Sequence, residues 1–480
     1  MNHPKIVIII FLFAGILIAG CKPENTGILI NVYPDSILAD VSHHPIGINV
    51  DYFMDDDNYL KPARRTADAL KAMGAKYLRY PGGNKSDLYL FSVPPYEIAK
   101  PTLARTGKGV VEYERVIKDN KEYRYDVLDF DEFIAMCREV GAEPVITVAA
   151  DEYLADYPEG STWTDRNGLI RNAVEWVRYA NIKKKYNVKY WLIGNECWHE
   201  NNPNSTAEIY ARDVVDFSKA MKAVDTSIYI IPNGNSVKFC ETVLKIAADY
   251  IDYFCISNYP IYEYNAGYAT YRDTLQDMMH PVNRALTAIA NTGLKNKLKL
   301  IISEYGPFDW GDKWPMINDM GHALFNFELA GKQLLVPEIE FSQFWNTRWI
   351  NNDSIENSVY DALDKDGNFN AIGYTLMIWG NFLGDNMVKT TSTLHIRSFA
   401  SYSPEEEILY VYIMNMMENP EYVTLDIGLN KVSSVIQAWE LVGKGPDDCN
   451  PVWQAHSGIT DPLDFEVKGT SITVIKYQLK

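Results

Sequence analysis

Eight apolar, strand-like segments alternate with helix-like segments along most of this chain, and this alternation limits the possible folds more than any other feature. Alternation of this kind is typical of parallel sheets covered by helices, and eight units predict a (β/α)8 barrel over residues 45–386. The expected strands are 45–53, 76–80, 144–149, 189–194, 227–232, 252–259, 298–304 and 338–345. The expected helices are 62–73, 125–140, 169–186, 207–224, 237–250, 271–292, 316–330 and 372–383.

A doubly wound open sheet is the alternative reading of the same alternation. Such sheets usually have fewer units and carry a glycine-rich nucleotide loop, and neither GxGxxG nor GxxxxGK[ST] occurs in the sequence. The barrel is therefore the preferred prediction.

The last part of the chain has a different pattern. Short stretches of alternating polarity at 409–413, 423–427, 434–439 and 470–477 are separated by Gly, Pro, Asn and Asp. This pattern predicts an antiparallel β-sandwich over residues 387–480. Residues 22–44 are expected to be a tether followed by a strand, near 28–32, that joins the sandwich.

The N-terminus has the features of a secretory signal. After Lys5 comes an apolar run at 6–18, which is too short to span a bilayer comfortably, since about 20 residues are needed. Residues 17–21 (LIAGC) resemble a bacterial lipobox, which implies cleavage before Cys21 and lipidation of its thiol. We therefore expect a protein of the bacterial cell envelope that contacts the membrane through a lipid anchor only. An ordinary signal peptide with a chance cysteine is the alternative.

Composition and missing motifs exclude several functions. The 63 acidic and 45 basic residues give a net charge of −18, which disfavours nucleic acid as a partner. The eight histidines form no HExxH motif and the cysteines form no CxxC pair, so neither a metal nor another cofactor is expected. The absence of a GxSxG motif argues against an esterase.

Two glutamates end expected strands of the barrel. Glu196 follows the fourth strand and Glu304 ends the seventh. In such barrels the reactive groups lie at the carboxyl ends of the strands. Two facing carboxylates, one protonated and one ionised, are what the cleavage of a glycosidic bond requires. Either residue alone would be an ordinary helix cap or loop ion pair, whereas the pair favours catalysis.

The neighbouring residues resemble a known family. The stretches 186–196 (YNVKYWLIGNE) and 78–84 (LRYPGGN) are similar to motifs of clan A glycoside hydrolases, especially family 51, the α-L-arabinofuranosidases. The resemblance covers the barrel, roughly 46–383, and extends to the sandwich that follows. It implies a retaining hydrolase that cleaves plant or algal polysaccharides, or their oligosaccharides, by double displacement.

The resemblance also implies individual roles. Glu196 would be the acid/base and Glu304 the nucleophile. Asn195 would bond the sugar 2-hydroxyl, and Arg79 would keep Glu304 ionised. A carbohydrate is therefore the expected partner.

Some positions depart from the family pattern or add to it. Asp51 stands where family 51 has a substrate-binding Glu, and Asn258 precedes Tyr259 where the family has a His-Tyr pair. Tyr259 is still expected to bond the nucleophile, and Trp345 is expected to stack on a sugar ring. The departures indicate a sugar that differs from the usual one of the family. Agarase-, porphyranase- and xylosidase-like members of the clan remain alternatives, as does a non-catalytic, glycan-binding surface lipoprotein.

Overall fold

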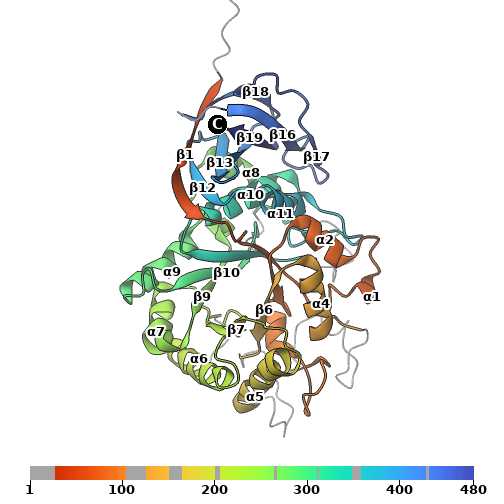
Figure 1. Cartoon of the computed structure of the whole chain (residues 1–480), viewed down its shortest axis with the longest axis vertical. Helices are drawn as coiled ribbons and strands as arrows, with labels where there is room; N and C mark the ends of the chain where they lie inside the picture. Colours follow the sequence, from red (N-terminus) through yellow and green to blue (C-terminus); the bar gives the residue numbers. More distant parts are fainter. Residues whose placement is uncertain are drawn as a thin grey trace, which may run out of the picture.

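The computed structural model describes residues 27–103, 126–150, 165–199, 206–263, 267–309, 311, 313–348, 358–428 and 432–480. It has two parts, a barrel and a sheet domain, which lie at the bottom and top of Figure 1. Cys21 and the expected signal segment are outside the described residues. Within the described part, no helix is long and apolar enough to cross a membrane.

The barrel is a parallel sheet of eight strands in the order β8-β7-β6-β3-β2-β11-β10-β9. Its two end strands meet through a parallel bridge between Asn233 and Cys255, so the sheet is nearly closed. The eight predicted strands are confirmed. They are β2 (Ile46–Asn49), β3 (Tyr77–Tyr80), β6 (Glu143–Val148), β7 (Tyr190–Ile193), β8 (Tyr229–Ile231), β9 (Tyr253–Asn258), β10 (Lys299–Tyr305) and β11 (Ile339–Phe344).

Helices surround the barrel, as Figure 1 shows. Their ends follow from local sequence: Asp129 and Glu132 form a capping box before α4, and Gly141 ends that helix in the left-handed conformation. The main helices are α2 (Thr66–Met73), α4 (Phe130–Val140), α5 (Arg166–Val177) with its π-helical continuation η2 (Arg178–Lys183), α6 (Ala207–Lys222), α7 (Val237–Ala247), α8 (Tyr268–Asp273), α9 (His280–Asn291), α10 (Met320–Leu334) and α11 (Ala371–Asn381). Short elements are α1 (Asp57–Leu60), η1 (Asn84–Leu88), η3 (Ala248–Tyr250), η4 (Pro260–Glu263) and the strand pair β4 (Tyr89–Leu90) and β5 (Thr102–Leu103).

Several predicted boundaries were wrong: α4, for example, begins at Phe130 and not at 125, and α10 begins at Met320 and not at 316. Two further differences have a clear local cause. The single helix expected at 271–292 is two helices, α8 and α9, with an extended residue, Thr274, ending the first. Pro281 lies in the first turn of α9, where its missing N–H costs nothing, while the same residue inside a continuous helix would break it. The first strand stops at Asn49 because the chain turns at Asp51, whose carbonyl accepts hydrogen bonds from the N–H groups of Met54 and Asp55.

The second part is a nine-stranded, mostly antiparallel sheet in the order β17-β16-β19-β14-β13-β12-β1-β15-β18. Its strands are β1 (Ile28–Asp40), β12 (Asn386–Thr390), β13 (Ile396–Ser403), β14 (Ile408–Asn415), β15 (Glu421–Asp426), β16 (Val432–Val442), β17 (Val452–Ala455), β18 (Asp464–Val467) and β19 (Ser471–Leu479). Strand β1 precedes the barrel in sequence but pairs with β12 and β15 of this domain. The predicted barrel with a C-terminal sandwich is confirmed.

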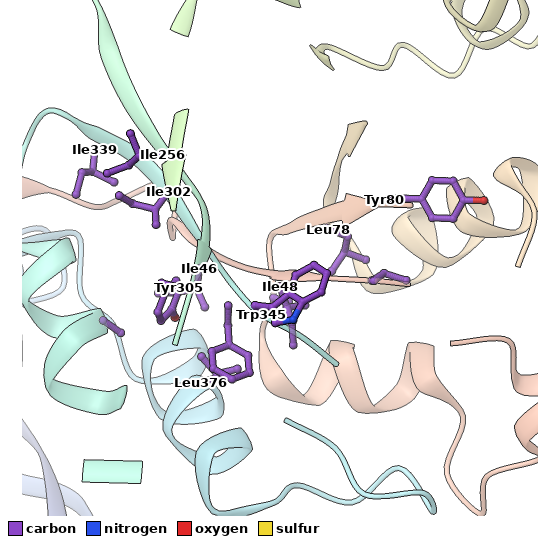
Figure 2. Packing of buried hydrophobic residues seen from close by; sticks show 14 of the residues in the cluster. Ile46, Ile48, Leu78, Tyr80, Ile256, Ile302, Tyr305, Ile339, Trp345 and Leu376 are labelled. Carbon is purple, nitrogen blue, oxygen red and sulfur yellow. The ribbon is translucent and has the colours of Figure 1, made fainter. Parts of the chain in front are cut away.

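Side chains alternate between the two faces of the barrel strands. Those that point outward belong to the core between the strands and the helices. Figure 2 shows Ile46, Ile48 and Leu78 of the strands, together with Leu376 of α11. The inward side chains form an apolar layer of Tyr77, Val145, Leu192, Ile231, Cys255, Ile301 and Phe341. Two residues nearer the carboxyl ends, the inward positions become polar: Asn49, Arg79, Thr147, Asn233, Ser257, Ser303 and Gln343. The polar layer is where the candidate site begins.

Candidate active site

A bulge in β10 turns Glu304 into the barrel. Ile302 pairs with Ile256 of β9 and Glu304 pairs with Ser257, so β10 contains one residue more than its neighbour at this point. Without the bulge, Glu304 would have the outward orientation of Ile302, since side chains two residues apart share a face. After the bulge, Tyr305 lies in the outer core again.

Arg79 is the central cation beneath Glu304. It is buried, and its Nη1 lies 2.7 Å from Glu304 Oε1 and 2.8 Å from Asn49 Oδ1. Its Nη2 donates to Asn195 Oδ1 at 2.6 Å, and its Nε donates to Thr147 Oγ1 at 3.1 Å. The guanidinium is therefore fixed from four other segments. A buried guanidinium at this distance holds the carboxylate in place through a charge-assisted hydrogen bond.

Glu304 also has contacts on its other side. The Tyr259 hydroxyl donates to Oε2 at 2.7 Å, as the sequence analysis expected of this residue. Burial and the charge of Glu304 raise the pKa of Tyr259 well above its usual value, so the phenol stays a donor. A Cβ on Gly83 would lie 2.8 Å from Glu304 Oε1 and 2.7 Å from Cη2 of Trp345. Only a glycine therefore fits here, and Trp345 lies beside the nucleophile candidate.

Glu196 is in a tight turn directly after β7. Both Gly194 (φ 68°) and Glu196 (φ 45°) have left-handed backbone conformations. This conformation is unfavourable for a glutamate and occurs mainly where the surroundings enforce it, often at functional sites. Asn233 encloses the turn: its Nδ2 donates to the carbonyls of Ile193 and Gly194, and its Oδ1 accepts from the N–H of Cys197.

The Glu196 carboxyl contacts strand β9. The Ser257 hydroxyl donates to Glu196 Oε1 at 2.5 Å. Burial, together with the nearby negative charge of Glu304, raises the pKa of Glu196 from 4.5 to about 8. Glu196 is therefore protonated at neutral pH, while Glu304 is bonded by Arg79 and Tyr259. A carboxyl that keeps its proton, next to a second carboxyl held by a buried cation, can act as acid beside a nucleophile.

Asn195, Asp51 and Asn258 differ in their relation to this centre. Asn195 accepts from Arg79, and its Nδ2 donates to Asn84 at 2.7 Å. Asp51 is buried, and its Oδ2 lies 3.0 Å from Lys85 Nζ. Burial raises the pKa of Asp51 even though Lys85 opposes the shift. Asn258 takes the outward orientation of its strand and lies 3.9 Å from the sulfur of Met279, so no described hydrogen bond joins it to either glutamate.

Several residues of the centre were not predicted from the sequence. Ser257, Asn233 and Asn49 all lie at inward positions of the polar layer. Strict alternation along β9 could have identified Ser257, because Cys255 is inward and Asn258 is not. Lys85 carried no comparable signal, since it comes from the short helix η1 after the second strand.

The described residues contain no group of three or more His, Cys, Asp or Glu side chains arranged to hold a metal ion.

Comparison with known proteins agrees with the geometry. The model of the alpha-L-arabinofuranosidase 1 domain matches residues 69–280. Alpha-L-arabinofuranosidase C of Emericella nidulans is 32% identical over 178 residues, which is 35% of this chain and 31% of the relative. The intracellular exo-alpha-(1->5)-L-arabinofuranosidase of Acetivibrio thermocellus is 27% identical over 228 residues, 43% of this chain and 40% of the relative. The resemblance to family 51 of clan A is confirmed.

The fold similarity is more extensive than the sequence similarity. The alpha-L-arabinofuranosidase of Thermotoga maritima, solved as an arabinose complex, has a TM-score of 0.68 and 20% identity, covering 93% of this chain and 99% of that structure. This likeness shows the shared fold. In sequence, the chain spans about a third of the length of the curated relatives it matches first.

Proposed function

We propose that this protein is a retaining glycoside hydrolase, α-L-arabinofuranosidase-like, that acts on plant or algal polysaccharides or their oligosaccharides. The observation that supports this most is the pair of carboxyls at two strand ends: Glu196 holds a proton at neutral pH, and Glu304 is bonded by a buried arginine. The arabinofuranosidase activities of the two relatives named above support the same proposal.

The reaction would proceed in two displacements. In the first, Glu304 attacks the anomeric carbon while Glu196 gives its proton to the glycosidic oxygen, and the C–O bond to the leaving group breaks. In the second, Glu196 takes a proton from water, whose oxygen attacks the same carbon and releases Glu304. Two inversions give net retention of configuration.

Neighbouring groups would position the charges and the sugar. Arg79 and Tyr259 would hold Glu304 in its attacking orientation, and the loss of their bonds would misplace it. Asn195, fixed between Arg79 and Asn84, would offer its amide to the sugar 2-hydroxyl. Trp345, which lies against Gly83 beside Glu304, would stack on the ring.

Asp51 would border the sugar as a pair with Lys85 and not as an isolated carboxylate. A Cβ on Gly82 would lie 3.1 Å from Asp51 Oδ2, which brings this pair next to the glycine turn that adjoins Glu304. A departure from the family at this position would therefore alter the recognition of the sugar and leave the two catalytic carboxyls in place.

The test is hydrolysis of 4-nitrophenyl α-L-arabinofuranoside, with arabinan, arabinoxylan, agarose, porphyran and aryl xylosides as the panel, and proton NMR of the first-formed anomer. We expect release of a sugar with retained configuration. Inverted product would contradict double displacement. Binding of a glycan from the panel without any hydrolysis would instead support the glycan-binding alternative.

We also propose that the protein is attached to the bacterial cell envelope through a lipid on Cys21. This is supported by the sequence of residues 6–21 alone. Metabolic labelling of expressing cells with an alkyne fatty acid should tag the wild-type chain and not Cys21→Ala. Equal labelling of the two would contradict the anchor, and a soluble, cleaved, unlabelled wild-type chain would support an ordinary signal peptide.

A further inference from the structure

Glu196 is restrained at both its backbone and its carboxyl, and the restraining groups come from two other strands. The backbone at Glu196 has a φ of 45°, which costs free energy in a glutamate. The carboxyl is half-buried and ends beside Ser257. Such a side chain keeps one orientation only if other groups compensate for both costs.

The end of β8 supplies the backbone restraint. Asn233 makes hydrogen bonds to residues on both sides of Glu196: its amide donates to the carbonyls of Ile193 and Gly194 at 3.2 and 3.1 Å, and its carbonyl accepts from Cys197 at 2.8 Å. Tyr210 completes the arrangement, because its hydroxyl donates to the Ile193 carbonyl at 2.7 Å. All of these groups are buried, so water does not replace them readily.

Strand β9 supplies the restraint on the carboxyl. Ser257 Oγ lies 2.5 Å from Glu196 Oε1. In the ladder Ser257 is also the direct neighbour of Glu304. A donor on Oε1 leaves Oε2 as the oxygen that holds the transferable proton.

We propose that Ser257 and Asn233 are the positioning residues of the acid/base, with Ser257 fixing which carboxyl oxygen carries the proton and Asn233 fixing the left-handed turn that aims it. This rests on the proposed function for its catalytic consequence. The two residues act only through Glu196: neither takes part in bond making.

The consequence is specific to proton transfer. Departure of a poor leaving group needs the proton of Glu196, whereas a dinitrophenolate leaves without it. Loss of the Ser257 hydroxyl should therefore reduce kcat/KM for alkyl or oligosaccharide substrates by about 10- to 100-fold, the range of one hydrogen bond to a charged group. For the 2,4-dinitrophenyl glycoside, kcat/KM should stay within about threefold of wild type.

Ser257→Ala, Ser257→Thr and Asn233→Ala test this, with Ser218→Ala as the matched control. Ser218 is also a buried serine whose hydroxyl donates a hydrogen bond, to the Tyr250 carbonyl at 2.6 Å. It lies in helix α6 and not in a strand of the barrel. We expect kcat/KM of Ser257→Ala and Asn233→Ala to fall for poor leaving groups only. Ser257→Thr keeps a hydroxyl and should recover the wild-type kcat/KM. Ser218→Ala should show no dependence on the leaving group. An equal loss on all substrates would indicate a structural role only and would overturn the proposal.

A titration that needs no turnover separates this inference from the proposed function. In protein labelled with 13C at the glutamate carboxyls, the Glu196 resonance, assigned with Glu196→Gln, should titrate at a higher pH in Ser257→Ala, because the hydroxyl stabilises the charged form. An unchanged pKa would overturn the role of Ser257. If the shift is present but wild type hydrolyses none of the panel, the positioning stands and the hydrolase proposal fails.

Discussion

Arg79 of β3 lies 2.7 Å from Glu304 of β10, and both side chains are buried inside the barrel. The contact joins two motifs that are 225 positions apart in the chain. Removal of only one partner of such a buried ion pair strongly destabilises the folded protein, because the other charge is left buried without compensation.

Replacement of Arg79 should therefore affect stability and activity together. We expect Arg79→Leu to lower the free energy of unfolding by about 3–5 kcal/mol. Urea denaturation monitored by tryptophan fluorescence measures this. Arg79→Lys should retain part of the stability, since a charge remains, but it loses the bonds that the guanidinium makes simultaneously to Glu304 and Asn195. A loss below about 1 kcal/mol in Arg79→Leu, within the range of an exposed pair, would contradict the arrangement.

The raised pKa of Glu196 predicts how activity depends on pH. Protonation of Glu196 is required for the first step, so kcat/KM should fall as pH rises through about 8. The alkaline limb should disappear for a 2,4-dinitrophenyl substrate, which does not need the proton. If kcat/KM fell in the same way at alkaline pH for the 2,4-dinitrophenyl substrate and for a substrate with a poor leaving group, the titration would belong to another group.

The same shift has a consequence for stability. Between the ordinary value of 4.5 and the folded value of about 8, the folded chain keeps a proton on Glu196 that the unfolded chain releases. The stability linked to this group is therefore fully present below pH 4.5 and is lost as pH rises through 8. Relative to wild type, Glu196→Gln should gain stability from pH 5 to pH 9 in thermal denaturation. A constant difference across that range would contradict the shift.

Gly83 should tolerate no side chain. An added Cβ would lie 2.8 Å from Glu304 Oε1 and within 2.8 Å of the Trp345 ring, so Gly83→Ala must displace one of them. We expect kcat/KM to fall by about 100-fold, the effect of a displacement near 1 Å at a reacting group. Gly445→Ala is the control, because a Cβ there meets nothing within 4 Å. Similar activity in the two variants would show that Gly83 does not adjoin the reacting groups.

The sandwich is fastened to the barrel by a buried ion pair between Arg397 of β13 and Glu328 of α10. Arg397 Nη2 also donates to the Tyr271 carbonyl at 3.0 Å, and the Tyr271 hydroxyl donates to Glu328 at 2.8 Å. Arg397→Met should cost about 3–5 kcal/mol, and the double variant with Glu328→Gln less than the sum of the two. The exposed pair of Lys245 and Glu241 is the control, where Lys245→Met should cost about 0.5 kcal/mol or less. Additive losses at Arg397 and Glu328 would contradict the coupling.

The sequence predicted the barrel and its two glutamates because each depends on local pattern. Mostly apolar runs such as 298–304 can be recognised in the sequence alone. Counting these runs assigns Glu196 to the fourth strand and Glu304 to the seventh. The orientation of Glu304 depends on something else. A bulge opposite Ser257 turns it inward, and a bulge is a relationship between strands that no single segment contains.

Asn258 and Ser257 are a second case in which side-chain orientation was not predicted from the sequence motif. The family comparison drew attention to Asn258, next to Tyr259, but alternation along β9 directs Ser257 toward Glu196 and Asn258 toward Met279. The helix expected at 271–292 is divided because α8 ends at Asp273 and Pro281 lies in the first turn of a new helix. In each case the deciding factor was orientation or a local break, and hydrophobic pattern alone reports neither.

The central claim is that Glu304 forms a covalent bond to the sugar. Incubation of Glu196→Gln with 2,4-dinitrophenyl α-L-arabinofuranoside should accumulate the glycosyl-enzyme, because departure of the dinitrophenolate needs no acid but hydrolysis of the intermediate needs the base. Peptide mass spectrometry should then find one pentosyl group on the peptide that contains Glu304, and none after Glu304→Ala. Modification of a different residue, or dinitrophenolate release that continues at the wild-type rate with no labelled peptide, would contradict the account.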